Sequence, residues 1–395
     1  MTHGTIAPNY VIRVGDSELD LGIRQFIDSV EYESADGLAD ILRIRATNPD
    51  FLLSDSRVLA PGNEVSVFMG YGTDLKHIGR VKIFKNAPNF PQDAMPTFEA
   101  VGYTRDHEMM FRQPEASSRG AVRGRGKQRG GRRFRQLKYS EAVTERAEDY
   151  GFNSDVDASP ETPTNFIQKA GMSDYDFVKG LANLTGFFFW VDGDENGIWT
   201  LHFRNPETFS DQDRTITFEY NNGDLTTLFR FEPELLVSGA IARIRARVRD
   251  PRTGRVLEAE FSEDNTRSPE VTLDPSIANL VDQIIDEEPA ASTSIQLFIG
   301  DFSFEAVANR RFQTEAELIQ WARQWFRRQR ENFILSRGLS IGVEDVFARQ
   351  IHKITGVGRM YDGDYFFSRV KHAMKTSGDG YTLDFNCRKQ TPPVT

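Results

Sequence analysis

Six histidines are the first residues of this chain that could do chemistry, as proton carriers or as metal ligands. They are His3, His77, His107, His202, His352 and His372. None belongs to a His-Glu-x-x-His helix or to another spacing typical of a metal site. Two of them, His202 and His372, lie within strand-like runs, which favours structural roles. The histidines therefore predict neither a metal centre nor a catalytic base.

Motifs for nucleophilic and phosphate chemistry are also missing from the sequence. There is no Gly-x-Ser-x-Gly elbow, and the glycine-rich residues 120–131 lack the Gly-Lys-Ser/Thr of a phosphate loop. A glycosidase needs only two suitably separated carboxylates, and the chain has 58 acids. A peptidoglycan-degrading tail enzyme therefore stays open as an alternative. We expect no catalytic residue, no cofactor and no enzymatic activity.

One acidic turn has part of a calcium-loop pattern. Asp192, Asp194 and Asn196 alternate, and Gly197 takes the sixth position of the loop. The twelfth position, which needs a glutamate, is Phe203. We therefore interpret the segment as a turn rather than as a metal site.

A basic segment is the candidate partner-binding site of this otherwise acidic chain. It contains no acid between residues 119 and 138, and its glycines favour neither helix nor strand. The candidate partner-binding residues are Arg119, Arg123, Arg125, Lys127, Arg129, Arg132, Arg133 and Arg135, and Lys138 closes the run.

Three interpretations of the basic segment remain open. It could be a loop that crosses the surface, or an arm that binds an acidic face of a neighbouring subunit or tail protein. It could also contact DNA passing through a channel. Only phosphates would be recognised there, because Phe134 is the single aromatic residue available for stacking.

Arginines also alternate along residues 241–262, which read as a β-hairpin. If Asp250 faces Arg255 across the turn, then Arg247 faces Glu258 and Arg245 faces Glu260. Opposite charges across strands contribute about 0.2–1 kcal/mol per pair. We favour this charge ladder on a solvated face over the alternative, an arginine stripe that lines a channel.

Bulk composition places the chain among globular proteins of several domains. It has 395 residues, of which 39% are hydrophobic and 27% charged. The net charge of −10 argues against a general nucleic-acid-binding protein, since affinity for phosphates comes mainly from basic residues. No apolar run approaches the ~20 residues of a membrane helix, and no secretory signal is visible. The single cysteine, Cys387, lies in a strand-like run and is interpreted as structural.

Short strand-like runs separated by turns dominate both ends of the chain. In the first 112 residues they are residues 10–14, 29–33, 41–46, 65–69, 81–84 and 97–101. Several alternate apolar with polar residues, which is typical of strands with one buried face. Residues 263–300 read as acidic and irregular, and a helix is predicted over residues 314–333 from the capping box at Thr314.

The middle of the chain reads as helices and a hairpin. One helix is predicted from Tyr139 to Asp149, with Ser140 as its cap. A second begins after Ser173, whose hydroxyl can accept the free amides of the first turn, and ends at Gly186. The β-rich run of residues 187–191, a turn and residues 198–203 then form a hairpin.

This helix-glycine-hairpin unit resembles the central segment of the phage tail hub family, which includes late control D proteins and the base domain of VgrG-type spike proteins. Two further segments fit the family in the same order. Near the N-terminus they are residues 61–65, Gly70-Tyr71 and residues 78–81, and near the C-terminus the closing hairpin of residues 362–385. The resemblance spans most of the chain.

The resemblance implies an α+β, mainly β fold with two tube-type β-barrel domains and a small inserted α+β domain. The expected limits are 1–112 for the first barrel, 113–137 for the basic loop, 138–212 for the insert and 213–395 for the second barrel. Three such chains would make a ring of six barrel units. The implied role is a trimeric baseplate hub that joins a threefold spike to a sixfold tail tube.

The partners follow from the same resemblance. They are a separate spike protein, because no spike domain follows the hub part, the tail tube protein, baseplate wedge proteins and the tape measure protein. The expected location is the tail baseplate of a virion assembled in the host cytoplasm, with DNA only in transit through the lumen. A hub-associated protein that binds nucleic acid through the basic loop remains the second alternative.

Overall fold

The structure is a computed structural model that carries side chains. It describes residues 7–113, 131–159, 165–206, 215–221, 223, 226–235, 243–249, 256–262, 293–299, 302–308, 318–319, 321–323, 334–376 and 380–389. No helix in this part of the chain is both long and apolar enough to cross a membrane.

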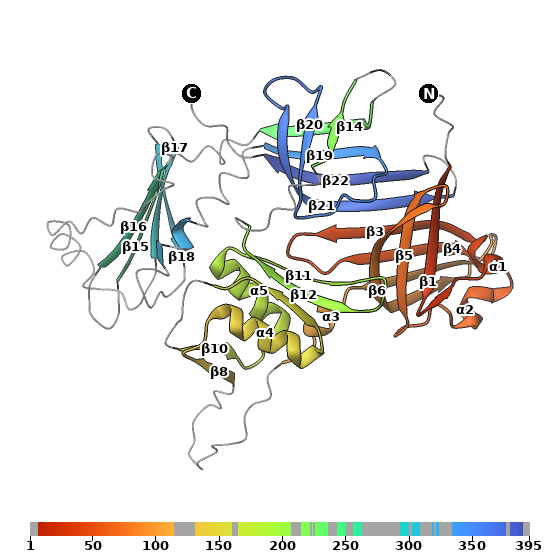
Figure 1. The fold of residues 1–395 in the computed structure, drawn as a ribbon, viewed down its shortest axis with the longest axis horizontal. Coiled ribbons are helices and arrows are strands. Elements are labelled where there is room, and N and C mark those ends of the chain that lie inside the picture. Colours follow the sequence, from red (N-terminus) through yellow and green to blue (C-terminus); the bar gives the residue numbers. More distant parts are fainter. Residues whose placement is uncertain are drawn as a thin grey trace, which may run out of the picture.

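A sheet of thirteen strands forms the body of the molecule (Figure 1). Its N-terminal strands are β1 (Pro8–Val14), β2 (Ser17–Glu18), β3 (Ile27–Ala35), β4 (Ile41–Thr47), β5 (Glu64–Tyr71), β6 (Asp74–Asn89) and β7 (Thr97–Tyr103). Its C-terminal strands are β13 (Thr217–Glu219), β14 (Leu228–Leu235), β19 (Ile334–Ile341), β20 (Ile351–Thr355), β21 (Gly363–Lys375) and β22 (Tyr381–Lys389). The main path runs β14-β19-β22-β21-β3-β4-β7-β6-β5-β1-β2.

The N-terminal and C-terminal strands of the chain are joined within this sheet, where β21 pairs antiparallel with β3. Seven residue pairs join the two strands, from Arg369 opposite Ala35 to Lys375 opposite Ser29. In Figure 1 the blue C-terminal strands therefore continue the layer of the red N-terminal strands. The two β-rich halves share one hydrogen-bonded sheet.

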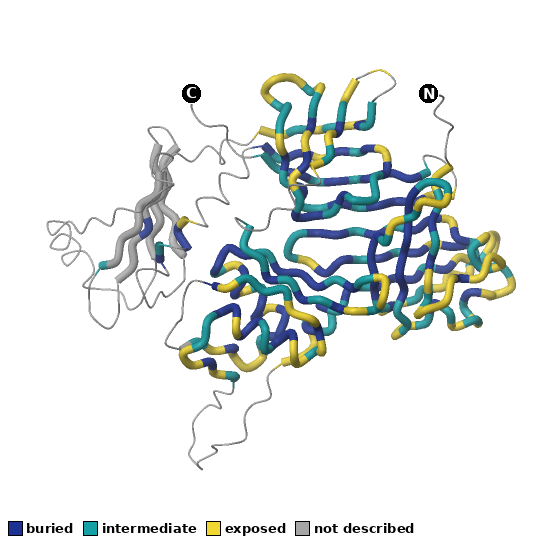
Figure 2. The backbone as a smooth tube through the Cα atoms, in the orientation of Figure 1, coloured by how far each residue is buried: buried dark blue, intermediate teal, exposed yellow. Residues whose placement is uncertain are grey.

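Alternating side chains place a separate core under each half. In β1, Tyr10 and Ile12 are buried while Arg13 is exposed, as the period of a strand requires. The first core gathers residues of β1 and of β3 to β7, and it takes Met374 and Tyr381 from the C-terminal strands. The second core gathers residues between Phe218 and Cys387. Figure 2 shows buried residues alternating with more exposed ones along many of these strands.

Gly338 shows how closely the second core is packed. A Cβ atom at this position in β19 would lie 2.2 Å from the ring of Phe385 on β22. Real Cβ atoms do not approach other atoms so closely, and interiors pack too densely for the ring to move away freely. The position therefore requires glycine.

The insert is a separate α+β layer beside the sheet. It contains β8 (Gly131–Arg135), α4 (Tyr139–Tyr150), β9 (Asn153–Val156), β10 (Asn165–Lys169), α5 (Asp174–Thr185), β11 (Phe188–Gly193) and β12 (Trp199–Arg204). The short helices α1 (Leu21–Arg24), α2 (Leu52–Ser56), which follows a 3₁₀ turn (Pro49–Phe51), and α3 (Asp106–Met109) belong to the first half. A third core, from Met109 to Phe203, fills the insert.

Helix α5 forms as the sequence predicts. The Ser173 hydroxyl accepts the amide of Asp176 at 3.0 Å, and Gly186 ends the helix with φ +76°. The apolar stripe, which includes Phe177 and Leu181, is buried. By contrast, the prediction for the cap of α4 was wrong, because Lys138 holds the cap position and Ser140 is buried against Ser159.

The remaining strands form a four-stranded antiparallel sheet in the order β16-β15-β17-β18. They are β15 (Arg243–Arg249), β16 (Val256–Ser262), β17 (Thr293–Ile299) and β18 (Phe302–Ala308). The predicted register is confirmed, with Arg245 opposite Glu260 and Arg247 opposite Glu258. The irregular segment predicted over residues 263–300 ends earlier than expected, because β17 takes its last residues. Most of the helix predicted over residues 314–333 lies outside the described residues, although residues 318–319 and 321–323 are helical.

The expected fold class is confirmed as mainly β, with two β-rich halves and an inserted α+β layer. One boundary differs from the expected loop 113–137, since residues 131–135 form β8 and pair with β10. Strand β10, which pairs with β8, lies some 30 residues later in the chain. The glycines and arginines of β8 therefore do not predict a strand there.

Candidate functional site

The predicted basic segment divides into two parts. Arg119, Arg123, Arg125, Lys127 and Arg129 lie outside the described residues. Arg132, Arg133 and Arg135 lie on β8, where successive side chains point to opposite faces. The eight residues form one run in the sequence. In the strand, however, Arg132 lies on one face and Arg133 and Arg135 lie on the other.

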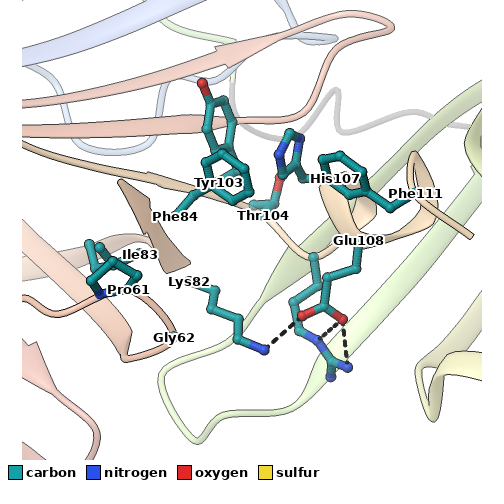
Figure 3. Close-up of a pocket in the computed structure, with 11 residues that line it drawn as sticks. Pro61, Gly62, Lys82, Ile83, Phe84, Tyr103, Thr104, His107, Glu108 and Phe111 are labelled. Carbon is teal, nitrogen blue, oxygen red and sulfur yellow. Dashed lines mark hydrogen bonds and ion pairs between the residues drawn. The ribbon is translucent and has the colours of Figure 1, made fainter. Parts of the chain in front are cut away.

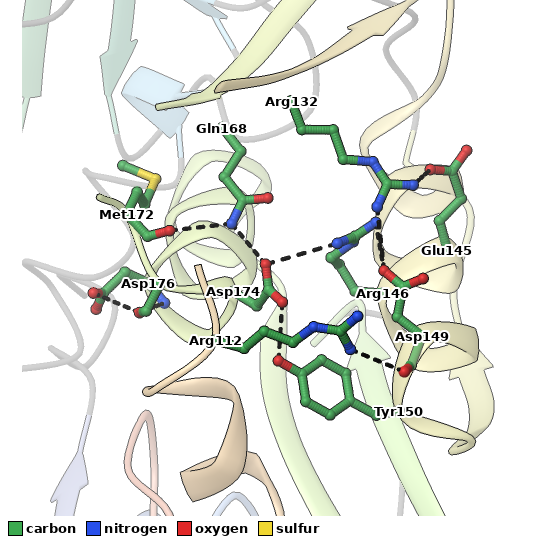
Figure 4. A network of polar contacts seen from close by, with 11 residues as sticks. Arg112, Arg132, Glu145, Arg146, Asp149, Tyr150, Gln168, Met172, Asp174 and Asp176 are labelled. Atoms are coloured by element: carbon green, nitrogen blue, oxygen red, sulfur yellow. Dashed lines mark hydrogen bonds and ion pairs between the residues drawn. The ribbon is translucent and has the colours of Figure 1, made fainter. Parts of the chain in front are cut away.

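Arg132 faces helix α4 and is held there by two carboxylates (Figure 4). Its guanidinium lies 2.8 Å from Glu145 and 3.2 Å from Asp149. Arg146, which is 4% exposed, also contacts Asp149 at 2.7 Å and reaches towards the buried Asp174. Arg132 therefore joins a network inside the insert, which makes it a structural residue.

Asp174 is the buried centre of this network. Gln168 donates to one of its carboxylate oxygens at 2.7 Å, and Tyr150 donates to the other at 2.9 Å. Buried carboxylates need such donors, because an unpaired charge in the interior is costly. The network in Figure 4 thus fixes β10, α4 and α5 relative to one another.

Arg133 and Arg135 are exposed on the opposite face of β8. Arg133 lies opposite Ile167 of β10, whose side chain is 46% exposed, and Lys169 adds a third cation to this face. Among the described residues, no carboxylate forms an ion pair with Arg133 or Arg135. We call this group of Arg133, Arg135, Ile167 and Lys169 the outer face of the β8–β10 ribbon.

A buried polar cluster joins the insert to both halves of the sheet. Arg349, from the loop before β20, donates to the carbonyl of Ala35 at 2.8 Å and lies 3.9 Å from Asp40. Its guanidinium also covers the ring of Trp190 on β11, with 4.7 Å to the ring centroid. Arg349 has φ +73°, an uncommon conformation for a residue with a side chain. We call this the three-part junction.

Two carboxyls of this junction are buried. Tyr32 donates to Asp40 at 3.0 Å, and Thr104 donates to Asp106 at 2.8 Å. Burial raises the pKa of Asp40 to about 6, although Arg349 opposes the shift. Burial likewise raises the pKa of Asp106 to about 7. Both groups therefore keep their protons to a higher pH than a solvent-exposed aspartate does.

Helix α5 adds hydrogen bonds to the same junction. Tyr175 donates to the carbonyl of Gly37 at 2.9 Å, and Lys179 donates to it at 2.7 Å. The central segment that carries the family resemblance thus packs onto the turn between β3 and β4. The sequence offers no signal for this contact, because Gly37 and Tyr175 are far apart along the chain.

The two histidines expected to be structural are both engaged within the fold. His202 lies between Asp155, at 2.8 Å, and Asp192, at 3.1 Å, and its ring stacks on Trp190. Burial opposes protonation of His202, but hydrogen bonds to the two carboxylates outweigh it and raise its pKa. His372 is buried, and burial lowers its pKa to about 4, so it is the neutral ring that contacts Tyr381 and the Val346 carbonyl.

The acidic turn and the cysteine also have structural explanations. The Asp194 carboxylate accepts the amides of Asn196 and Ile198, which closes the turn. Within the described residues, no three His, Cys, Asp or Glu side chains are grouped to hold a metal ion. Cys387 is buried in β22, and burial raises the pKa of its thiol.

Comparisons with known proteins give matches by structure alone. No family model and no curated protein matches the sequence. The 43 kDa tail protein of prophage MuSo2 from Shewanella oneidensis matches with a TM-score of 0.62 at 8% identity, over 97% of this chain and 98% of that one. A tail protein from Neisseria meningitidis MC58 matches with a TM-score of 0.59 at 10% identity, over 97% of both chains.

A third match comes from a secretion system. The E. coli c3393 protein is a component of the type VI secretion system with structural similarity to the T4 bacteriophage tail proteins gp27 and gp5. It matches with a TM-score of 0.54 at 10% identity, over 97% of this chain and 77% of that one. The chain therefore has the fold of these tail proteins, and the expected resemblance is confirmed at the level of the fold.

Proposed function

We propose that this chain is a structural hub subunit in the baseplate of a contractile tail or of a related injection machine. The observation that carries the proposal is the match over 97% of the chain to two tail proteins of nearly the same length. The match extends over the whole length of the chain rather than over one domain. It therefore supports a mechanical role for both β-rich halves, like that proposed for the chain as a whole.

The subunit would act as a trimer that joins a threefold spike to a sixfold tube. Each chain has two β-rich halves with separate cores, so three chains in closed symmetry supply six units. The shared sheet supports this, because pairing of β3 with β21 holds the two halves of one chain at a fixed angle. Interfaces between subunits would be obligate and bury about 2,000 Å² or more.

The edges of the large sheet are where neighbouring subunits could meet. Among the strands that the structure describes, β14 is the outermost at one end, and it contains Pro233. Proline has no amide to donate, and charged residues alternate with it, as on edges protected from strand pairing. We therefore propose contacts through side chains at β14 and through the backbone only at the β1–β2 edge.

The role would be mechanical rather than enzymatic. Two of the residues that could do chemistry are held by structural partners, His202 by two carboxylates and His372 by Tyr381. The buried acids Asp40 and Asp106 lie within the junction and away from solvent. The proposed partners are a spike protein, the tail tube protein, wedge proteins and the tape measure protein, with DNA only passing through the ring.

We propose that the outer face of the β8–β10 ribbon binds one of these partners through an acidic surface. Arg133 and Arg135 carry this proposal, since their charges face solvent, whereas Arg132 is engaged inside the insert. Deleting residues 119–135 would not test it, because Phe134 is 2% exposed within the core of the insert. The double charge reversal Arg133→Glu with Arg135→Glu leaves that core intact.

The native mass of the purified chain tests the hub assignment first. We expect a species of three times 44.9 kDa, alone or after addition of the spike protein encoded with it. A chain that stays monomeric with the spike present would contradict the assignment. The charge reversal is then compared with Lys375→Glu in co-purification with spike and tube proteins. If the double charge reversal loses one partner and Lys375→Glu does not, the result supports binding through the outer face of the β8–β10 ribbon.

A further inference from the structure

A surface pocket lies between β6, β7 and α3, and four rings line it, of which Phe84 and Phe111 are exposed (Figure 3). Its volume is about 450 Å³. Phe84, Tyr103, His107 and Phe111 line one side, and Lys82, Arg105 and Glu108 line another. The pocket is distinct from the outer face of the ribbon, and it shares only Thr104 with the three-part junction.

A register shift brings Phe84 into this pocket. Along β6 the pairing with β7 shifts between Ile83 and Lys85, so Phe84 is the extra residue between two regular pairs. Such bulges turn a side chain away from the direction that the strand would give it. The result is a phenylalanine that is 53% exposed beside a well-packed sheet.

The rings of the pocket already form an ordered wall. His107 stacks on Tyr103 with 4.4 Å between centroids and contacts Phe84 and Phe111 edge-on at 4.8 Å and 5.0 Å. Phe111 is 67% exposed, and its ring lies nearly parallel to that of Phe84 at 6.1 Å. A ligand that packs here would bury apolar surface without first ordering these side chains.

The polar side of the pocket carries an excess positive charge. Lys82 lies 2.9 Å and Arg105 3.1 Å from the same carboxylate, that of Glu108. Burial opposes ionisation of Glu108, but hydrogen bonds from Lys82 and Arg105 outweigh it and lower its pKa. Burial lowers the pKa of His107, which keeps that ring neutral. Two cations therefore face one anion, and the Lys82 side chain is 42% exposed.

We infer that this pocket binds an aromatic side chain flanked by carboxylates on an extended segment of a partner protein. The exposed rings would pack against the aromatic group, and the unmatched positive charge would attract its acidic neighbours. The inference rests on the pocket alone and does not depend on the proposed function.

A short peptide containing 4-fluorophenylalanine between acidic residues is a direct probe. With the full-length chain, ¹⁹F relaxation of acetyl-Glu-Asp-(4-fluoro-Phe)-Asp-Glu-amide should report binding in the millimolar range, as expected for contact with one pocket. Raising the salt concentration should weaken it, since the charges are exposed. A peptide with lysines in place of the acids should bind more weakly, and equal binding of both peptides would contradict the charge argument.

Two variants and one control test the location. Phe84→Ala and Phe111→Ala should each weaken binding about 2- to 12-fold, the range for loss of one aromatic pair. Phe90→Ala is the matched control, because this residue is similarly exposed, at 57%, but does not line the pocket. Binding that is unchanged in both pocket variants, or absent in the unaltered chain, would overturn the inference.

The same variants distinguish a second copy of this chain from a different partner. If the native mass falls in Phe84→Ala but not in Phe90→Ala, the pocket is an interface between copies and the inference is wrong. If the mass is unchanged and peptide binding falls, the inference holds whether or not the chain is a trimer.

Discussion

Single buried residues give the sharpest prediction, and Asp106 is the clearest case. Its folded pKa of about 7 exceeds the value of about 3.9 for an unfolded aspartate. Its contribution to stability is therefore fully present below about pH 4 and is lost as pH rises to about 7. We expect Asp106→Asn to increase the free energy of unfolding at pH 8 by on the order of 1–4 kcal/mol.

Urea unfolding of the two proteins at pH 4.5 and pH 8 measures this effect. The asparagine keeps an oxygen that accepts from Thr104, so the hydrogen bond is preserved. The difference between variant and parent should grow with pH. A difference that is the same at both values would show that Asp106 is ionised in the folded chain.

The contribution of His202 to the free energy of unfolding should depend on pH, because the protonated ring pairs with two carboxylates. Its raised folded pKa means that its contribution is fully present below about pH 6.5 and is lost as pH rises through the folded value. We expect His202→Gln to cost about 1–2 kcal/mol at pH 6, since both carboxylates are partly exposed, and less at pH 9. Thermal unfolding at the two pH values checks the sign, and a larger cost at pH 9 would contradict it.

At the scale of elements, the cap of α5 offers a test of a predicted feature. Ser173→Ala removes the acceptor of the Asp176 amide and should lower the free energy of unfolding by about 1 kcal/mol. Ser173→Thr keeps a hydroxyl and serves as the control. Chemical denaturation compares the three proteins, and an alanine variant as stable as the threonine variant would show that the cap contributes nothing.

Elements whose signals are local were predictable from the sequence. Helix α5 has its cap, stripe and final glycine in one segment, and the alternating charges in the sequence predict the register in which β15 and β16 pair. Strand β8 was not predictable, because its partner β10 lies beyond an intervening helix. Ser140 has the residue type of a cap, but tertiary contact with Ser159 buries it instead.

The candidate surfaces were predictable only in part. The run of arginines is visible in the sequence, yet the division between Arg132 and Arg133 follows from the strand that carries them. The aromatic pocket gives no signal, since its rings come from β6, β7 and α3 and Phe84 owes its position to a shift in pairing. The exposed face of β8 and the aromatic pocket both depend on pairing between distant segments. The periodicity of residues within one segment cannot predict such pairing.

At the scale of the whole molecule, Arg349 links three parts of the fold. Arg349→Ala should cost about 3–5 kcal/mol at pH 8, because Asp40 would lose the nearby cation that favours its ionised form. Hydrogen exchange should show lost protection in residues 36–40 and in β11. The cost should be smaller at pH 5, where Asp40 is protonated, and Arg337→Ala on β19 provides a comparison at an exposed arginine.

The pairing of β3 with β21 has a further consequence during synthesis. Glu33 and Arg369, which form an ion pair across these strands, are 336 residues apart. A ribosome adding about 5–20 residues per second needs roughly 20–70 s to cover that distance. Throughout this time the nascent chain holds β3 as an unpaired edge, which can join other chains. Chaperone capture of the half-made protein would therefore matter most before β21 emerges.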